Sequence, residues 1–500
     1  MRDIPYDVWL CITQFIPRNE LLRLYGVDCT LFDIVMNERY RETRIYHLGD
    51  EMTRQCLVGL GFPGIARRVR TLHLRPHLFG KPLAFHGQKK SLSQSLLRKL
   101  SKEEKQSAAT AKASVQLLRS ITNLTNLVTL NLECQNYPVD DYDDFKLAIP
   151  FIMNGWLAYG SVLRTLSLKI PLEACKECLP SSLRLPSLED LSIHIFTAYL
   201  TTDATKLVRS ILVPFVNRHS LTIESLTIST PMAFNYNISP IFGELEYLPL
   251  LTKIDVYFPL ISLQQTDSAG LHHLLKAQSA NLLTLRIRFG HLFGLTTQPP
   301  APCALFAHPM FKVSLPNLKS LELNILGHNT RLVQCVVPYL HQFRDSLTTL
   351  VLNHHQATHL EAYDIIDVFE HSSSRLLLLD LWLTHLSPSF LDVLSVKLPD
   401  LERLSLSFGT FVGHDHTFSM TRSYSHRHIP IQEFCSEMPN HVYAEWKLKH
   451  LKIGNVGYCA GILAQCETAL AMSLPGVKTF DGLSRRDYLA KWDLVYCKVV

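Results

Sequence analysis

The chain has 500 residues, of which 47% are hydrophobic and 19% charged, so it contains enough apolar material to bury a large core. Lysine and arginine exceed aspartate and glutamate by 49 − 44 = 5, and no basic tail gathers this excess, so charge does not favour a nucleic-acid-binding protein. No run of about 18 apolar residues predicts a membrane span. Asp3 and Asp7 interrupt the start, which argues against a signal peptide. The expected location is therefore cytoplasmic or nuclear.

Residues 4–42 show the pattern of three short helices. In the first, apolar residues at i, i+4, i+7 and i+8 share one face, and Pro17 is expected to end the helix; they are Val8, Ile12, Phe15 and Ile16. Asn19 is a candidate cap for the second helix, and Asp28 or Thr30 for the third. A bundle this small cannot bury all of its apolar groups. The excess is expected to face either the rest of the chain or another protein.

A six-residue pattern with aliphatic residues at positions one, four and six recurs along the rest of the chain. Most copies lie about 25 to 36 residues apart. Alternation at the end of each copy predicts a short strand: in "LHLR", Leu72 and Leu74 point one way while His73 and Arg75 point the other. The copies are 69–74, 127–132, 163–168, 188–193, 223–228, 251–256, 282–287, 318–323, 347–352, 376–381, 401–406 and 448–453.

Because one copy is too small to bury its own apolar face, the copies are expected to stack into a parallel sheet. The stretches 206–216 and 363–372 have helical spacing and would cover its outer surface. The pattern resembles leucine-rich-repeat proteins, but the asparagine usual after each strand is missing. The expected fold is therefore α/β: an irregular leucine-rich-repeat solenoid, with a parallel sheet on the concave face and helices on the convex face, preceded by a small α-helical module.

The expected domain organisation follows from these patterns. Residues 1–45 form the helical module, 46–64 a linker helix, 65–480 the solenoid and 481–500 a C-terminal cap. Insertions are expected near 85–121, which is polar, and near 409–445. The second contains four histidines, and a solvated loop is favoured over a metal site there; they are His414, His416, His426 and His428. Cys175 and Cys178 form a single CxxC pair, which is only half of a zinc site, so no metal is expected.

The stretch "IPYDVWLCITQFIPRNELLRLYGVDCTLF" resembles an F-box. It has an Ile-Pro opening, an amphipathic segment, a proline-containing turn, a Leu-Leu pair, and then Val and a hydrophobic close. Together with "FDIVMNERYRETRI" and "GIARRVRTLHLRP", it is similar to fungal F-box proteins with leucine-rich-like repeats. Thr30 and Leu31 depart from that family, which often has Arg or Lys at these positions.

The resemblance implies the substrate-recognition subunit of an SCF-type ubiquitin ligase. In that family the F-box binds the Skp adaptor, and through it a cullin scaffold, while the repeats bind the protein to be ubiquitinated. Ubiquitin transfer belongs to other subunits, so no catalytic role or cofactor is implied. Carried over by position, the adaptor contacts would be Ile4, Pro5, Val8, Ile12, Phe15, Ile16, Pro17, Leu21, Leu22, Val27 and Phe32.

A target protein is expected to bind the exposed side chains of the stacked strands, which form the usual recognition surface of a solenoid. The C-terminal half of this surface is richer in charged and aromatic residues, the types that dominate interface energetics. The substrate-binding candidates are Asp255, Tyr257, Arg286, Arg288, Glu322, Asn324, Asp380 and Trp382.

Signatures of catalysis are missing from the sequence. It contains no GxxxxGK[ST] phosphate loop, no GxSxG elbow, no HExxH and no GxGxxG after a strand. The acidic pairs in "DDYDD" (140–144) are expected in a surface loop. Two alternatives to the ligase subunit stay open: a repeat-based binding scaffold outside any ligase, whose first helices are only a cap, and a hydrolase or metal enzyme that uses the histidines between 414 and 428.

Overall fold

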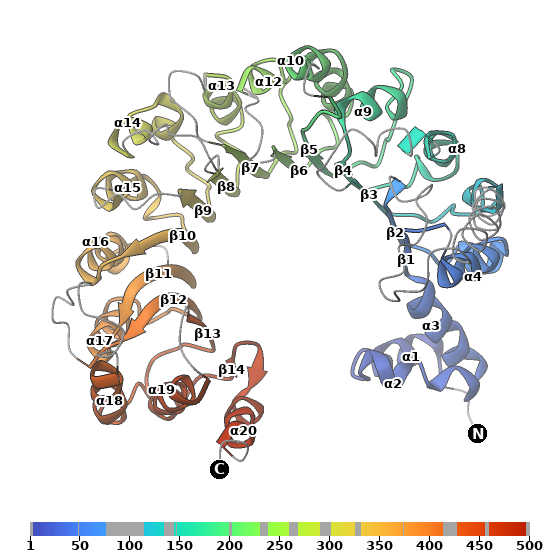
Figure 1. Cartoon of the computed structure of the whole chain (residues 1–500). Helices are drawn as coiled ribbons and strands as arrows, with labels where there is room; N and C mark the ends of the chain where they lie inside the picture. Colours follow the sequence, from blue (N-terminus) through green and yellow to red (C-terminus); the bar gives the residue numbers. More distant parts are fainter. Residues whose placement is uncertain are drawn as a thin grey trace, which may run out of the picture. The chain divides into compact units, whose positions relative to one another are not determined.

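The computed structural model describes residues 4–48, 50–76, 115–134, 145–146, 148–199, 203–230, 239–259, 269–290, 302–325, 332–373, 375–413, 428–455 and 460–496. The chain divides into two compact units, Met1–Leu251 and Thr252–Val500. Each is an α/β structure built around a mostly parallel open sheet, a solenoid-like arrangement (Figure 1). The boundary between the units falls within the stretch 65–480 that the sequence assigns to one solenoid.

The first unit begins with three helices and a 3-10 turn: α1 (Tyr6–Thr13), α2 (Arg18–Leu21), η1 (Leu24–Gly26) and α3 (Cys29–Tyr40). The side chain of Asp28 accepts a hydrogen bond from the backbone N–H of Thr30, so Asp28 caps α3 as predicted. Two local predictions are wrong. The first helix ends at Thr13, before Phe15 and Ile16, and Pro17 rather than Asn19 precedes α2.

Parallel strands follow in chain order in the first unit. They are β1 (Glu42–Ile45), β2 (Thr71–Leu74), β3 (Thr129–Glu133), β4 (Thr165–Lys169), β5 (Asp190–His194) and β6 (Ser225–Ser229). Equivalent leucines stand beside one another in register: Leu72 pairs with Leu130, and Leu130 with Leu166. The sheet starts earlier than predicted, since β1 occupies the last four residues of the expected helical module 1–45.

Helices of the first unit lie along one face of the sheet that these strands form (Figure 1). They are α4 (Glu51–Leu60), α5 (Pro63–Ala66), residues 115–121, α8 (Ile149–Tyr159), α9 (Leu172–Cys178), α10 (Ala204–Leu207), the π-helical turn η3 (Val208–Leu212), α11 (Val213–Arg218) and α12 (Ser239–Gly243). The helix predicted over 206–216 is confirmed, and the expected linker segment 46–64 contains α4.

The second unit repeats this plan. Its strands are β7 (Lys253–Pro259), β8 (Thr284–Gly290), β9 (Ser320–Ile325), β10 (Thr349–Ala357), β11 (Leu378–Leu386), β12 (Arg403–Phe411), β13 (His450–Asn455), β14 (Thr479–Phe480) and β15 (Leu483–Ser484). Its helices are α13 (Ala269–Ala277), α14 (Pro302–Phe306), η4 (Pro309–Lys312), α15 (Leu332–Leu340), η5 (His341–Phe343), α16 (His359–Glu370), α17 (Pro388–Lys397), α18 (His428–Glu437), η7 (Met438–Asn440), α19 (Ala460–Ser473) and α20 (Arg485–Tyr496). The helix predicted over 363–372 is confirmed by α16.

The parallel run ends in an antiparallel hairpin between β14 and β15. Its two turn residues, Asp481 and Gly482, have φ values of 50° and 82°, the left-handed conformation that tight two-residue hairpins require. The side chain of Asp481 also accepts a hydrogen bond from the backbone N–H of Ile453. The hairpin and α20 fill most of the segment expected to cap the C-terminus.

The core of each unit is built from the predicted repeat positions. All twelve copies of the pattern coincide with strands β2 to β13, and the alternating burial is confirmed: Leu72 and Leu74 are fully buried while His73 is not. Burying one such leucine stabilises the fold by roughly 1.5–3 kcal/mol. Repeating it along every strand gives a continuous apolar layer between the sheet and the helices, and leaves the opposite sheet face to polar side chains.

Candidate protein-interaction surfaces

The N-terminal helices expose many of their apolar side chains. Phe15 is 86% exposed and Val27 is 67% exposed, which is unusual for large apolar residues that lie close together in the chain. Eight of the eleven sequence-predicted adaptor contacts are exposed; they are Ile4, Pro5, Val8, Ile12, Phe15, Pro17, Val27 and Phe32. We call these eight residues the N-terminal apolar surface.

The other three predicted contacts are less accessible. Ile16 and Leu22 are half-buried, and Leu21 is only 6% exposed. Leu21 therefore belongs to the interior of the helical module, where Ile34 and Val35 of α3 are also buried. Helix periodicity could not separate Leu21 from Leu22, because α2 is only four residues long. The pattern predicts which residues are apolar, whereas the packing of α2 decides which of them face inward.

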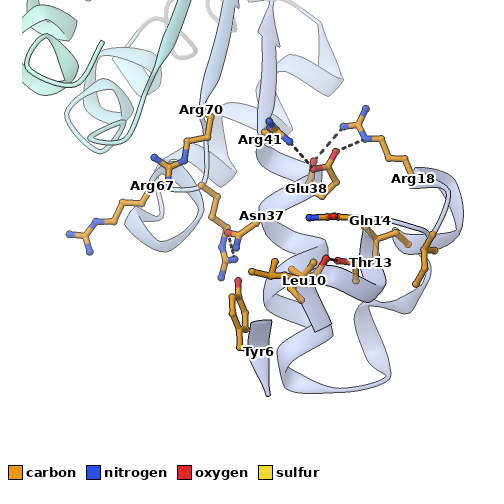
Figure 2. A pocket seen from close by; sticks show the side chains of 14 residues that line it. Tyr6, Leu10, Thr13, Gln14, Arg18, Asn37, Glu38, Arg41, Arg67 and Arg70 are labelled. Carbon is orange, nitrogen blue, oxygen red and sulfur yellow. Dashed lines mark hydrogen bonds and ion pairs between the residues drawn. The ribbon is translucent and has the colours of Figure 1, made fainter. Parts of the chain in front are cut away.

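A pocket of about 570 Å³ lies where the helical module meets α5 and β2. Figure 2 shows its lining, which comes from α1, the turn after it, α2, α3 and the segment before β2. The apolar and aromatic lining residues are Tyr6, Leu10, Ile16, Leu21 and Ile34. The polar and charged lining residues are Thr13, Gln14, Arg18, Asn37, Glu38, Arg41, Arg67, Arg68 and Arg70. Sequence reasoning did not identify this pocket, because its lining is drawn from separate segments.

Internal pairing engages only part of the charge around this pocket. Arg68 is the least exposed of the arginines, at 22% for its side chain, and donates to a carboxylate oxygen of Asp33 at 2.7 Å and to Oδ1 of Asn37 at 2.7 Å. Arg18 lies 3.1 Å from Glu38, and Arg41 lies 3.7 Å from the same carboxylate (Figure 2). These ion pairs join α2 to the end of α3, and α3 to the segment between α5 and β2.

Six of the eight predicted substrate-binding residues meet on three adjacent strands of the second unit. In one row across the strands, Asp255 stands beside Arg286, which stands beside Glu322. Two residues further along each strand, Tyr257 stands beside Arg288, which stands beside Asn324. Asp380 and Trp382 lie on β11, which β10 separates from this group. We call the six residues on β7, β8 and β9 the charged ladder.

Ion pairs within the charged ladder connect its strands. Arg288 donates to Asp255 at 2.7 Å, and Arg286 lies 3.2 Å from Glu322 and 3.9 Å from Asp255. Asp255 is 5% exposed, whereas the side chains of Arg286 and Arg288 are 41% and 35% exposed. The two cations and two anions neutralise one another, so a partner would meet a charge-balanced surface instead of a field of one sign.

Tyr257 and Asn324 complete the charged ladder. The guanidinium carbon of Arg288 lies 5.7 Å from the centre of the Tyr257 ring, and burial raises the pKa of Tyr257 while Arg288 opposes the shift. Among the residues that the structure describes, Nε of Arg288 and Oδ1 of Asn324 are buried without a hydrogen-bond partner. Because these residues are neighbours in register, a donor and an acceptor are both left unused on the same row.

A similar cluster lies on the first unit, which sequence reasoning ranked lower. Glu133 accepts from Arg75 at 2.9 Å and from Lys169 at 3.2 Å across three neighbouring strands. Burial would raise the pKa of Glu133, but the hydrogen bonds from Arg75 and Lys169 outweigh it, so that pKa is lowered. The ring of Tyr46 stacks under Arg75, whose guanidinium carbon is 4.3 Å from its centre. Charge in register is therefore a feature of both units.

Two groups of residues were considered as metal ligands in the sequence: the Cys175–Cys178 pair and the four histidines between 414 and 428. Cys175 and Cys178 are buried, and burial raises the pKa of both thiols, which disfavours the thiolate that would bind zinc. Within the described ranges no group of three or more His, Cys, Asp or Glu is arranged to hold a metal ion. His414, His416 and His426 lie outside those ranges, as do residues 85–114 and the acidic stretch 140–144; His428 begins α18.

Comparison with known proteins adds no further constraint. No family model matches the chain, and no curated protein matches it. None of the helices in the described part of the chain is long and apolar enough to cross a membrane. The functional interpretation therefore rests on the surfaces described above.

Proposed function

We propose that the chain is the substrate-recognition subunit of an SCF-type ubiquitin ligase, with F-box helices at 1–45 followed by leucine-rich-like repeats. The N-terminal apolar surface would bind a Skp adaptor, and the polar face of the repeat sheet would bind a target protein. The observation that carries the proposal is the exposure of the eight predicted adaptor contacts. A helical cap whose only role was to shield the first repeat would turn such side chains inward.

Energetics supports a docking role for this surface. Each large apolar side chain that leaves water on binding contributes roughly 1.5–3 kcal/mol, so a few of them supply most of the affinity of an ordinary interface. Apart from the two prolines, Phe15 and Val27 are the most exposed of these residues and are the strongest candidates for central contacts. Leu21 is better assigned to the interior of the module, where it would support Leu22 and Ile16.

The repeats would act by position and not by chemistry. In this proposal the charged ladder, with Asp380 and Trp382 nearby, contacts the target, and the helical module connects that target to the ligase. Holding two reactants together raises their effective concentration, which accelerates a transfer reaction without a catalytic group on this chain. A soluble cytoplasmic or nuclear location fits such a role.

Co-purification with a fungal Skp adaptor tests the proposal. The wild-type chain should retain the adaptor, and Val8→Asp combined with Phe15→Asp should release it, because both side chains are exposed and both changes place charge in the apolar contact. Leu157→Asp is a matched control, since Leu157 is 89% exposed but lies on α8. Leu21→Asp is unsuitable, because a buried charge would unfold the module.

The alternative is a repeat-based scaffold that is not linked to ubiquitination. It predicts that wild-type chain and both variants behave identically toward the adaptor. Retention of the adaptor by the double variant would also count against the proposal, because binding would then not use the N-terminal apolar surface.

A further inference from the structure

The pocket beside the helical module combines apolar and neutral polar side chains with arginines around them (Figure 2). Leu10, Ile16 and Ile34 contribute apolar side chains, while Arg18 and Arg41 lie on one side and Arg67 and Arg70 on the other (Figure 2). Its volume of about 570 Å³ falls in the range of pockets that enclose a ligand or a few peptide side chains.

Positive charge on the rim is not fully compensated. Five arginines and one acidic residue, Glu38, line the pocket. Outside the lining, Asp33 pairs with Arg68 and Glu42 attracts Arg18, so the charge that is left uncompensated is mainly that of Arg67 and Arg70. The side chain of Arg70 donates to the backbone carbonyl of Asn126, at 3.3 Å, and has no acidic partner in the described part of the chain. Within the described residues, the guanidinium of Arg67 has no acidic partner. Both side chains are exposed and so are available to a ligand.

The placement of these charges discriminates between possible ligands. A compact anion such as phosphate is bound best by guanidinium forks that converge in a buried site. Here the most buried guanidinium, that of Arg68, is already used by Asp33, Asn37 and the carbonyl of Gly64. The other arginines stand apart: Arg18 and Arg41, which share Glu38, lie on one side, and Arg67 and Arg70 lie on the other. This spacing fits an extended polyanion better than a point charge.

We propose that this pocket binds an acidic peptide segment in which an apolar residue is flanked on both sides by aspartate or glutamate. The apolar side chain would enter between Leu10 and Ile34, and the flanking carboxylates would reach Arg41 on one side and Arg67 and Arg70 on the other. None of the eight residues of the N-terminal apolar surface lines the pocket, although two other predicted adaptor contacts, Ile16 and Leu21, do. It does not depend on the proposed ligase function, and it would give the helical module a second, charge-selective contact.

Fluorescence anisotropy on the full chain tests the proposal. The probe is a dye-labelled synthetic peptide with one leucine flanked on each side by aspartate and glutamate. It should bind, and binding should weaken as salt is raised, because exposed charge pairs are screened. The combined change Arg67→Glu with Arg70→Glu should weaken binding by at least about tenfold, since it turns two attractive charges into repulsive ones.

Matched controls separate the site from general basicity. Arg184→Glu changes an exposed arginine of the first unit whose side chain donates to the backbone carbonyls of Ser181 and Leu183, and it should leave the affinity unchanged. A peptide with asparagine and glutamine in place of the acids should not bind. Replacing the peptide leucine by serine should also weaken binding, because the apolar contact is lost.

Three results would overturn the inference. If tripolyphosphate displaces the peptide as effectively as unlabelled peptide does, charge alone is recognised and the ligand is a phosphate-type anion. If the double charge reversal and Arg184→Glu weaken binding equally, the peptide binds non-specifically. If the peptide does not bind at low salt to a chain that is folded by circular dichroism, the pocket is not an acidic-peptide site.

Discussion

Asp255 is predicted to stabilise the second unit, because it joins two strands through nearly buried charge. Its carboxylate accepts from Arg288 at 2.7 Å and lies 3.9 Å from Arg286, and the residue is only 5% exposed. Asp255→Ala would remove the anion and leave Arg288 without its partner on β7. A hydrogen bond between charged groups contributes about 1.5–3 kcal/mol. Because both arginines are partly exposed and water can replace part of the loss, we expect a cost of about 2 kcal/mol.

Thermal unfolding measures this cost. For a unit of roughly 150–250 residues, 1 kcal/mol corresponds to about 2–4 °C in Tm, so Asp255→Ala should lower the transition that reports the second unit by about 4–8 °C. Asp255→Asn should lower it less, since the amide oxygen still accepts a hydrogen bond. Glu402→Ala serves as the control. Glu402 pairs with Lys449 just before the neighbouring strands β12 and β13, but both side chains are about 40% exposed, so this change should leave Tm nearly unchanged.

Equal effects of Asp255→Ala and Glu402→Ala would refute this reasoning, because burial would then add nothing to the ion pair. A rise in Tm with Asp255→Ala would refute it more strongly. It would show that desolvating the carboxylate costs more than its two arginines return.

Three further predictions concern separate parts of the chain. Burial, aided by Lys169, lowers the pKa of His194 to about 4 from its ordinary 6.5. Between these two pH values the unfolded chain binds a proton that the folded chain does not, so the free energy of unfolding should fall as pH drops from about 6.5 to about 4. His194→Gln should reduce the accompanying fall in Tm. Cys175 and Cys178 should react with a thiol reagent only after unfolding, since both are buried with raised pKa values; rapid reaction in the native state would contradict their placement. Thr358→Ala should destabilise by about 1 kcal/mol in urea titration, because it removes the capping box at the start of α16, whereas Thr358→Ser should be nearly neutral.

The strands could be predicted from the sequence because each carries the same physical signal. Leucines at alternate positions must face the core, and an equivalent residue stands beside each in register, so period and spacing together define the sheet. β1 and β14 were not predicted, since β1 has only Thr43 and Ile45 facing inward and β14 is two residues long. Such short elements form because neighbouring strands pair with them, which is a tertiary effect.

The candidate surfaces were predictable only in part. The sequence indicated which residues lie on the sheet face, but the ion pairing of Asp255 with Arg286 and Arg288 depends on register, so residues expected to contact a target also hold the strands together. Leu21 was expected on the adaptor surface and is buried, because α2 is too short for periodicity to define a face. The arginine-lined pocket had a local signal in "ARRVR" alone, and the rest of its lining comes from the first three helices.

The most direct test of the proposed function is calorimetric titration of a Skp adaptor into the full chain. The prediction is a dissociation constant of about 1 µM or tighter and a negative heat-capacity change, as expected when an apolar surface is buried. Phe15→Asp should weaken this binding at least about tenfold, and Leu157→Asp should leave it unchanged. No detectable binding by a folded wild-type chain, or equal binding by the Phe15 variant, would contradict the assignment of the N-terminal apolar surface as the adaptor-docking site.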